Sequence, residues 1–191
     1  MRVIAGTYKG RALAAPKGVS TRPTTDRVKE SLMSALVSAY GSLEGARVLD
    51  AFAGSGALGI ECLSRGAESV HFFERDKAAL AALERNVGML GADERAVRVF
   101  RADVLANPPL FGSAPYDIVL LDPPYALPAE QVCGLLSSLH AHGRIAEGAV
   151  ASYEHDAACD VAPFLAASGM RMDILSTRRF SKTAIDLIRF A

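Results

Sequence analysis

The chain has 191 residues, 50% of them hydrophobic and 22% charged, which is typical of one globular domain and excludes a disordered chain. Its formal net charge of +0 argues against a uniformly basic nucleic-acid binder, and its 3 cysteines form no C-x-x-C pair that would indicate a disulfide framework or a zinc site. No segment has the ~20 apolar residues of a membrane span or the apolar start of a signal peptide, so we expect a cytoplasmic protein without metal or membrane partner.

Two short strands begin the chain. Residues 2–5 and 11–15 lie on either side of a glycine-containing turn, so we expect them to form a β-hairpin. A helix follows from about Asp26, because apolar side chains recur every three or four residues as far as Val37, and Gly41 is placed to end it. Together these elements form a small N-terminal extension of hairpin and helix.

From residue 47 onward, short apolar strands alternate with helices, which is typical of a mostly parallel sheet with helices on both faces. Strands are expected at residues 47–52, 69–74, 97–103, 116–122 and 149–153. Helices are expected at residues 57–65, 77–90, 129–140 and 161–167. Two final strands, at residues 171–177 and 184–190, are joined by a short link and should pair antiparallel. The pattern predicts an α/β fold with a seven-stranded sheet.

Basic residues gather at the two ends of the chain. Residues 1–29 hold 7 basic side chains and 1 acidic one, and residues 171–191 hold 5 basic and 2 acidic ones. Such asymmetry favours a basic arm for phosphates on an acidic catalytic body, although a solvated basic face is an equally simple interpretation. The candidate phosphate contacts are Arg2, Lys9, Arg11, Arg22, Arg27, Lys29, Arg179 and Lys182.

A glycine-rich turn follows the first strand of this sheet. Residues 48–59 read Val-Leu-Asp-Ala-Phe-Ala-Gly-Ser-Gly-Ala-Leu-Gly, and glycines there let the backbone approach a ligand that any Cβ would repel. Glu74 ends the next strand 20 residues after Gly54, where a carboxylate can accept both ribose hydroxyls of a nucleoside cofactor. The candidate cofactor contacts of this region are Asp50, Phe52, Ala53, Gly54, Ser55, Gly56, Glu74 and Arg75.

Two kinds of nucleoside cofactor are compatible with this turn. Residues 54–59 match G-x-G-x-x-G, a pattern that also occurs in dinucleotide oxidoreductases. Asp50 favours a methyl donor, because a carboxylate repels pyrophosphate but suits the ammonium group of a methionine moiety. Asp103 closes the next strand and can meet an adenine amino group, with Val104 packed on the ring, although an aspartate there is as often a helix cap.

Residues 117–125 form an apolar strand that ends in Asp122-Pro123-Pro124-Tyr125. An exocyclic amine on a base is a poor nucleophile, because its lone pair is delocalised into the ring. If Asp122 and the carbonyl of Pro123 each accept one N–H, the nitrogen can pyramidalise and direct its lone pair at a methyl group. The prolines remove amide donors, and Tyr125 offers a flat face to a base rotated out of its stack. The alternative interpretation is an ordinary Pro-Pro turn.

Three motifs carry a resemblance to a known family. Asp50-Ala-Phe-Ala-Gly-Ser-Gly and Asp122-Pro-Pro-Tyr are shared by many amino-methyltransferases, whereas Arg22-Pro-Thr-Thr-Asp-Arg-Val-Lys-Glu is far more family-specific. With these motifs the chain closely resembles the bacterial 16S ribosomal RNA guanine-N2 methyltransferases of the RsmD type. The similarity extends from Arg2-Val-Ile-Ala-Gly to Arg179-Phe-Ser-Lys-Thr, nearly the whole chain.

The resemblance implies a class I, Rossmann-like methyltransferase fold that uses S-adenosylmethionine to methylate the N2 amine of one guanine in 16S rRNA. The substrate would be the free rRNA or a small-subunit assembly particle, and the enzyme a monomer. Residues 1–40 would be an RNA-binding extension and residues 41–191 the catalytic domain. Two positions depart from the family pattern: Ser181 stands where glycine is usual, and Arg75 where a hydrophobic residue is common.

The motifs alone do not identify the base, so an adenine-N6 or cytosine-N4 methyltransferase acting on DNA or RNA is the closest alternative. The short chain, which lacks a separate target-recognition domain, argues against a sequence-specific DNA enzyme. A non-catalytic ribosome-assembly factor is a further alternative, which the intact Asp122-Pro-Pro-Tyr motif disfavours. The segment Tyr153-Glu154-His155 follows a strand and could touch the substrate, although a structural role at the strand end is the simpler interpretation.

Overall fold

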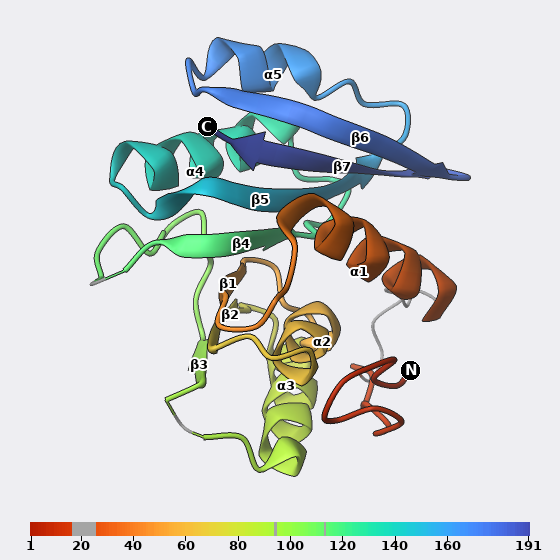
Figure 1. Ribbon diagram of the computed structural model, residues 1–191. Helices are drawn as coiled ribbons and strands as arrows, with labels where there is room; N and C mark the ends of the chain where they lie inside the picture. Colours follow the sequence, from red (N-terminus) through yellow and green to blue (C-terminus); the bar gives the residue numbers. More distant parts are fainter. Residues whose placement is uncertain (17–25, 94, 113) are drawn as a thin grey trace.

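The computed structural model describes residues 1–16, 26–93, 95–112 and 114–191. These residues form a seven-stranded sheet in the order β3-β2-β1-β4-β5-β7-β6 (Figure 1). The strands are β1 (Arg47–Asp50), β2 (Ser69–Phe73), β3 (Val97–Phe100), β4 (Tyr116–Leu121), β5 (Ile145–Asp156), β6 (Met172–Phe180) and β7 (Thr183–Phe190). Neighbours among β1 to β5 pair in parallel, and β7 pairs antiparallel with both β5 and β6. The predicted fold class, including the antiparallel C-terminal hairpin, is confirmed.

Helices cover both faces of the sheet (Figure 1). Three helices contribute to one core cluster: α1 (Asp26–Tyr40), α2 (Ala57–Ser64) and α3 (Lys77–Leu90). Two contribute to a second cluster on the opposite face: α4 (Ala129–Ala141) and α5 (Ala162–Ala167). Because helices cover both faces, a central strand must be apolar along its whole length, and residues 118–120 of β4 are completely buried.

Two strands differ most in length from the prediction. β3 ends at Phe100 instead of residue 103, because it is an edge strand whose only partner, β2, ends opposite it at Phe73. β5 covers residues 145–156 rather than 149–153, because it has partners on both sides, β4 and β7, to satisfy its backbone groups. Neither change moves the carboxyl edge of the sheet, where the candidate site lies.

The N-terminal hairpin is reduced to a single antiparallel bridge between Arg2 and Ala12. The longer paired strands that the sequence predicted do not form, because the arm bonds to α2 as well as to itself. The amides of Ile4 and Ala5 donate to the Glu61 carboxylate of α2 at 2.8 and 3.0 Å. Apolar residues of the arm also belong to the core cluster of α1 and α2. The described part of the extension therefore shares its core with the catalytic region.

The prediction that Lys29 contacts RNA is wrong. Its side chain is completely buried, its Nζ lies 3.4 Å from Glu61 Oε2, and the same nitrogen donates to the carbonyl of Arg2. A charge count places Lys29 in the basic arm, but a buried ammonium requires a buried anion, and α2 supplies one. Arg22, another candidate for RNA contact, lies outside the described residues.

The turn between β6 and β7 contains Ser181, whose φ of +56° is the only positive value of a non-glycine residue in the described part of the chain. A left-handed conformation costs an L-residue about 1–2 kcal/mol. We therefore expect Ser181→Gly to raise the free energy of unfolding by roughly 0.5–1 kcal/mol, measured by urea denaturation, after allowing for the greater unfolded-state entropy of glycine. The serine at this position is therefore a small strain that the fold tolerates.

The matched control is Ser34→Gly, because Ser34 is exposed in the middle of α1. There the same change should lower the free energy of unfolding by about 0.5 kcal/mol, since glycine is a poor helix former. If Ser181→Gly destabilises the protein as Ser34→Gly does, the left-handed strain at Ser181 is absent in solution.

Candidate active site

Four acidic side chains stand at the carboxyl ends of neighbouring strands. Asp50 ends β1, while Glu74, Asp103 and Asp122 follow β2, β3 and β4. These four strands are parallel to their neighbours, so their carboxyl ends meet at one edge of the sheet. The chain order changes direction at β1, which lies between β2 and β4, and open α/β sheets bind ligands at such a point. The structure thus brings the predicted cofactor and catalytic residues together.

The first two glycines of the turn have different physical reasons to be glycine. Both Gly54 and Gly56 have positive φ, of +56° and +79°. A Cβ on Gly56 would lie 2.4 Å from Leu83 Cδ1, so this glycine allows α2 and α3 to pack closely. A Cβ on Gly54 would meet no atom within 4 Å. With Ala53 and Ser55 buried on either side, Gly54 is the point at which a ligand can approach the backbone.

Asp50 lies beneath the turn, with 1% of its surface exposed. Its Oδ2 accepts the amide hydrogen of Gly59 at 3.0 Å and so stabilises the first turn of α2. Burial raises the pKa of Asp50 to about 7; the Gly59 hydrogen bond opposes this rise, and the charge of Glu74 adds to it. Phe52, two residues later, is partly exposed. Asp50 therefore shapes the turn from below, rather than presenting its carboxylate at the surface.

Glu74 connects the end of β2 to the glycine turn. Its Oε2 accepts the amide hydrogen of Gly54 at 2.8 Å, and its Oε1 accepts those of Arg75 and Asp76 at 2.8 and 2.7 Å. Three backbone donors thus fix a carboxylate that is itself partly exposed. This position beside Gly54 is one from which it can accept ribose hydroxyls.

Arg75 and Asp103 form an ion pair across the ends of β2 and β3. Arg75 Nη1 lies 2.5 Å from Asp103 Oδ2, and 67% of the Arg75 side chain is exposed. Burial raises the pKa of Asp103, but hydrogen bonds from Leu105 and Arg75 outweigh it, so its pKa lies below the ordinary value. Val104 is 2% exposed and belongs to the second core cluster, so the structure gives no support to its predicted packing on adenine.

The Asp-Pro-Pro-Tyr segment forms a turn that directs its aromatic residue outward. The amide of Leu127 donates to the carbonyl of Pro124 at 2.8 Å. Pro123 is buried, whereas Pro124 and Tyr125 are exposed, and 47% of Tyr125 is accessible. A large aromatic side chain this exposed offers a surface on which a planar ligand can stack.

Asp122 is the first residue after β4 and is partly exposed. Burial raises the pKa of its carboxyl well above the ordinary value, and the charges of Glu154 and Asp50 raise it further. A carboxylate with a raised pKa is a stronger proton acceptor than an ordinary aspartate. Carboxyl groups from β1, β4 and β5 are therefore near neighbours at this edge of the sheet.

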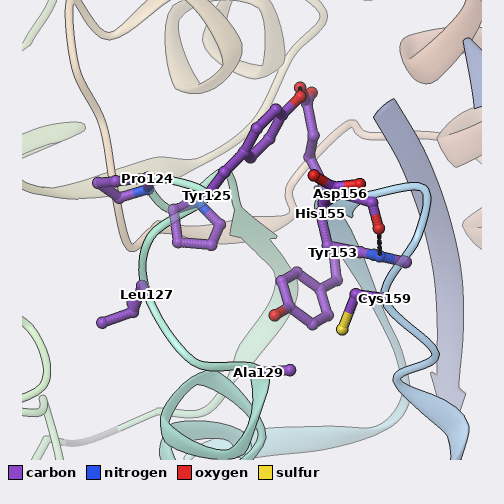
Figure 2. A pocket seen from close by; sticks show the side chains of 10 residues that line it. Pro124, Tyr125, Leu127, Ala129, Tyr153, His155, Asp156 and Cys159 are labelled. Atoms are coloured by element: carbon purple, nitrogen blue, oxygen red, sulfur yellow. Dashed lines mark hydrogen bonds between the residues drawn. The ribbon is translucent and has the colours of Figure 1, made fainter. Parts of the chain in front are cut away.

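Tyr125 connects the turn to β5 and β7. Its hydroxyl donates to Glu154 Oε1 at 3.2 Å and is hydrogen-bonded to Thr183 Oγ1. Figure 2 shows a small cavity between the Asp-Pro-Pro-Tyr turn and β5, with Pro124 and Tyr125 on one side and Tyr153 on the other. Thr183 was not assigned to the site from the sequence, although it ends the Arg179-Phe-Ser-Lys-Thr motif. Glu154 could have been assigned to the site, because it lies near the carboxyl end of β5, the strand next to β4, and carboxyl ends share an edge.

Comparison with known proteins agrees with this geometry. Residues 1–184 match the family profile described as Conserved hypothetical protein 95. The chain is 41% identical over 160 residues to YlbH of Bacillus subtilis, which covers 82% of this chain and 83% of YlbH. It is 39% identical over 140 residues to the ribosomal RNA small subunit methyltransferase D of Haemophilus influenzae, covering 71% and 70% of the two chains. This chain belongs to the RsmD family of methyltransferases.

The fold of the RsmD family extends over the whole chain. The solved structure of Escherichia coli yhhF matches with a TM-score of 0.80 at 31% identity, covering 100% of this chain and 97% of that one. In the described ranges, no helix is long and apolar enough to cross a membrane. The same residues contain no group of three or more His, Cys, Asp or Glu side chains placed to hold a metal ion.

Some of the basic residues predicted to contact RNA lie at the same edge of the sheet as Asp122 and Tyr125. Arg179 and Lys182 flank the turn of the β6–β7 hairpin, next to Thr183 and therefore close to Tyr125. Both are exposed, although Arg179 also donates a hydrogen bond to a backbone carbonyl. Arg27 is exposed in the first turn of α1, and a hydrogen bond from β6 reaches the next turn of that helix. Because that bond joins α1 to the strand that carries Arg179, we treat Arg27, Arg179 and Lys182 together as one candidate basic surface.

Lys9 and Arg11 lie away from the glycine turn, whereas Arg2 is bridged to Ala12 and its carbonyl accepts a hydrogen bond from Lys29. The two amides that precede Lys9 donate to Ser64, which is the last residue of α2. The glycine turn lies at the opposite end of α2, just before its first residue. A helix of this length spans about 12 Å. Arg11 donates to two carbonyls at the end of α3, one of them at 2.6 Å. The structure therefore does not bring Lys9 and Arg11 to the Asp-Pro-Pro-Tyr turn.

Proposed function

We propose that this RsmD-type enzyme transfers a methyl group from S-adenosylmethionine to the N2 amine of one guanine in 16S rRNA. Action on ribosomal RNA is supported by the family and by the name of the Haemophilus influenzae relative. The choice of guanine N2 goes beyond those names. The observation that carries the proposal is the Asp122-Pro-Pro-Tyr turn at the end of β4, at the same sheet edge as the open glycine turn.

The residues around the glycine turn fit S-adenosylmethionine. The open space at Gly54 can admit a ligand, and in this proposal Glu74 accepts the ribose hydroxyls and Asp103 receives the adenine amine. Asp50 adds negative potential beneath the turn, which favours the ammonium group of the methionine moiety. When bound, the cofactor supplies an electrophilic methyl group.

Asp122 and the backbone carbonyl of Pro123 hold the amine of the target base. Each accepts one N–H, which leaves the nitrogen lone pair free to point away from both acceptors. Positive charge develops on that nitrogen during methyl transfer, and the carboxylate stabilises it. Because its pKa is raised, Asp122 can also take the proton that the methylated nitrogen releases. Tyr125 supplies the exposed ring on which the base stacks.

Glu74→Gln is expected to weaken S-adenosylmethionine binding by roughly tenfold, because an amide is a poorer acceptor for two hydroxyls than a carboxylate. Isothermal titration calorimetry measures the dissociation constant. Glu68→Gln is the matched control, since Glu68 precedes the amino end of the same strand and is exposed. If both variants bind S-adenosylmethionine as tightly as the parent does, Glu74 does not contact the cofactor.

Replacing Arg27, Arg179 and Lys182 together with alanine is expected to weaken binding of 16S rRNA and to flatten its salt dependence. Each lost phosphate contact should reduce the log–log slope by about 0.7 to 0.9. Filter binding over a range of salt concentrations gives the slope. Arg171→Ala is the control, because Arg171 precedes β6 at the amino edge of the sheet. If the triple variant keeps the parental slope, this basic surface does not contact RNA.

The proposed function is tested by mass mapping of modified bases in 16S rRNA from cells that lack this protein. One N2-methylguanine should be missing, and should return when the parental gene is restored but not when an Asp122→Ala gene is supplied. An unchanged set of modifications, or the loss of a methyl group from adenine or cytosine, would overturn the assignment to guanine N2.

A further inference from the structure

Glu154 and Asp122 occupy equivalent positions on neighbouring parallel strands. Leu121 of β4 is paired with Tyr153 of β5, so the next residue on each strand is Asp122 and Glu154. Adjacent strands are about 4.8 Å apart. Leu121 and Tyr153 both face the second core cluster, and side chains alternate along a strand, so the two acidic residues turn toward the other face together. Glu154 thus stands beside the predicted catalytic acid.

Glu154 also borders the surface on which the base is expected to stack. Its Oε1 accepts a hydrogen bond from the hydroxyl of Tyr125 at 3.2 Å, and Glu154 itself is partly exposed. The cavity between the turn and β5 has a volume of about 40 Å³, which is room for a few waters and not for a base. We therefore expect a base to lie on the exposed ring of Tyr125 rather than inside this cavity, with its polar edge toward the two carboxylates.

The three bases with an exocyclic amine differ in the ring nitrogen that lies beside that amine on the Watson–Crick edge. In guanine, N1 carries a hydrogen and is a donor. In adenine N1 and in cytosine N3, the corresponding nitrogen is an acceptor without a hydrogen. A carboxylate next to the amine-binding acceptor therefore attracts guanine and repels adenine and cytosine, and a flipped base is read by such contacts to its Watson–Crick edge.

We propose that Glu154 selects guanine by accepting its N1–H while Asp122 and Pro123 hold the N2 amine. This inference rests on the proposed function, because it explains how that site would distinguish guanine from the other amino bases. Two acceptors on adjacent strands match two adjacent donors on one base. Neither the glycine turn nor the Asp-Pro-Pro-Tyr motif makes this distinction, since both serve any exocyclic amine.

The sharpest probe is 2-aminopurine, which keeps the 2-amine of guanine but has an acceptor at N1. Small-subunit particles are reconstituted with rRNA that carries either guanine or 2-aminopurine at the position mapped in cells. The parental enzyme is expected to methylate guanine about 100-fold more efficiently, because the Glu154 carboxylate accepts a hydrogen bond from guanine N1–H but repels the bare N1 acceptor of 2-aminopurine. Equal efficiencies with the parental enzyme would overturn the role of Glu154 without any variant.

Glu154→Gln is expected to reduce the preference for guanine over 2-aminopurine at least tenfold, because the amide can donate to a bare N1. Glu147→Gln on the exposed start of β5 is the control and should keep the parental preference. Tyr125→Phe separates the two roles of Glu154. If Glu154 acts only by holding the Tyr125 hydroxyl, Tyr125→Phe should lower the preference for guanine as much as Glu154→Gln does. If Glu154 contacts the base directly, the Tyr125→Phe enzyme should be slower but keep the parental preference.

The outcomes separate this inference from the proposed function. If the parental enzyme methylates adenine or cytosine instead of guanine, the proposed function fails. If it methylates guanine and discriminates against 2-aminopurine, but Glu154→Gln keeps the full preference, then another residue selects the base. Calorimetry with S-adenosylmethionine confirms that each variant is folded, because the cofactor site does not include Glu154.

Discussion

Asp122→Ala is expected to lower the rate constant of methyl transfer by two to three orders of magnitude while S-adenosylmethionine still binds. Asp122 is one of two acceptors that hold the amine, and it is the only charged one as positive charge develops on the nitrogen. Removing a single preorganised electrostatic partner typically costs about 3 to 4 kcal/mol of transition-state stabilisation. Asp122→Asn should lose less, because it keeps one acceptor oxygen. Single-turnover measurements at saturating cofactor report the chemical step.

The fold provides an internal control for this experiment. The raised pKa of Asp122 means that burial and the charges of Glu154 and Asp50 destabilise its ionised form in the folded protein. This penalty appears as pH rises above the ordinary aspartate pKa and is absent in acid, so at neutral pH Asp122→Asn should not lower the free energy of unfolding. If the Asp122→Asn variant is slow but as stable as the parent, the substitution has impaired catalysis and not folding. If the Asp122→Ala variant transfers methyl groups at the parental rate, Asp-Pro-Pro-Tyr is only a structural turn and has no catalytic role.

The sheet and the two motifs could be predicted because their determinants are local. The apolar runs around β1 and β4 fit only strands covered on both faces, and parallel strands necessarily bring their carboxyl ends to one edge. Asp50, Glu74 and Asp122 therefore followed from the positions of strand ends alone. The position of Gly54, with open space around it, also follows from its place in the turn.

The errors concern contacts between residues far apart in the chain. Val104 follows Asp103 in sequence, but whether it faces a ligand or the core depends on the packing of α4 and its neighbours. The division of the basic residues between two ends of α2 depends on where the arm docks, and that is set by Glu61 and Ser64, more than 50 residues away. Neither periodicity nor a charge count contains this information.

Lys29→Ala is expected to lower the free energy of unfolding by about 3 kcal/mol, the lower end of the range for breaking a buried ion pair. The substitution leaves the buried Glu61 carboxylate without its ammonium partner and removes the hydrogen bond to the carbonyl of Arg2. The loss is limited because Arg65 and two arm amides still contact Glu61. Equilibrium urea denaturation gives the free energy.

Lys9→Ala is the matched control, because Lys9 is an exposed lysine of the same arm and should change stability by no more than about 0.5 kcal/mol. RNA affinity separates the two possible roles of Lys29. Burial predicts that folded Lys29→Ala protein keeps the parental salt dependence of RNA binding, since an enclosed ammonium neutralises no phosphate. If Lys29→Ala leaves stability unchanged and instead reduces the salt slope, Lys29 reaches the surface in solution and the arm does not dock on α2 as the structure has it.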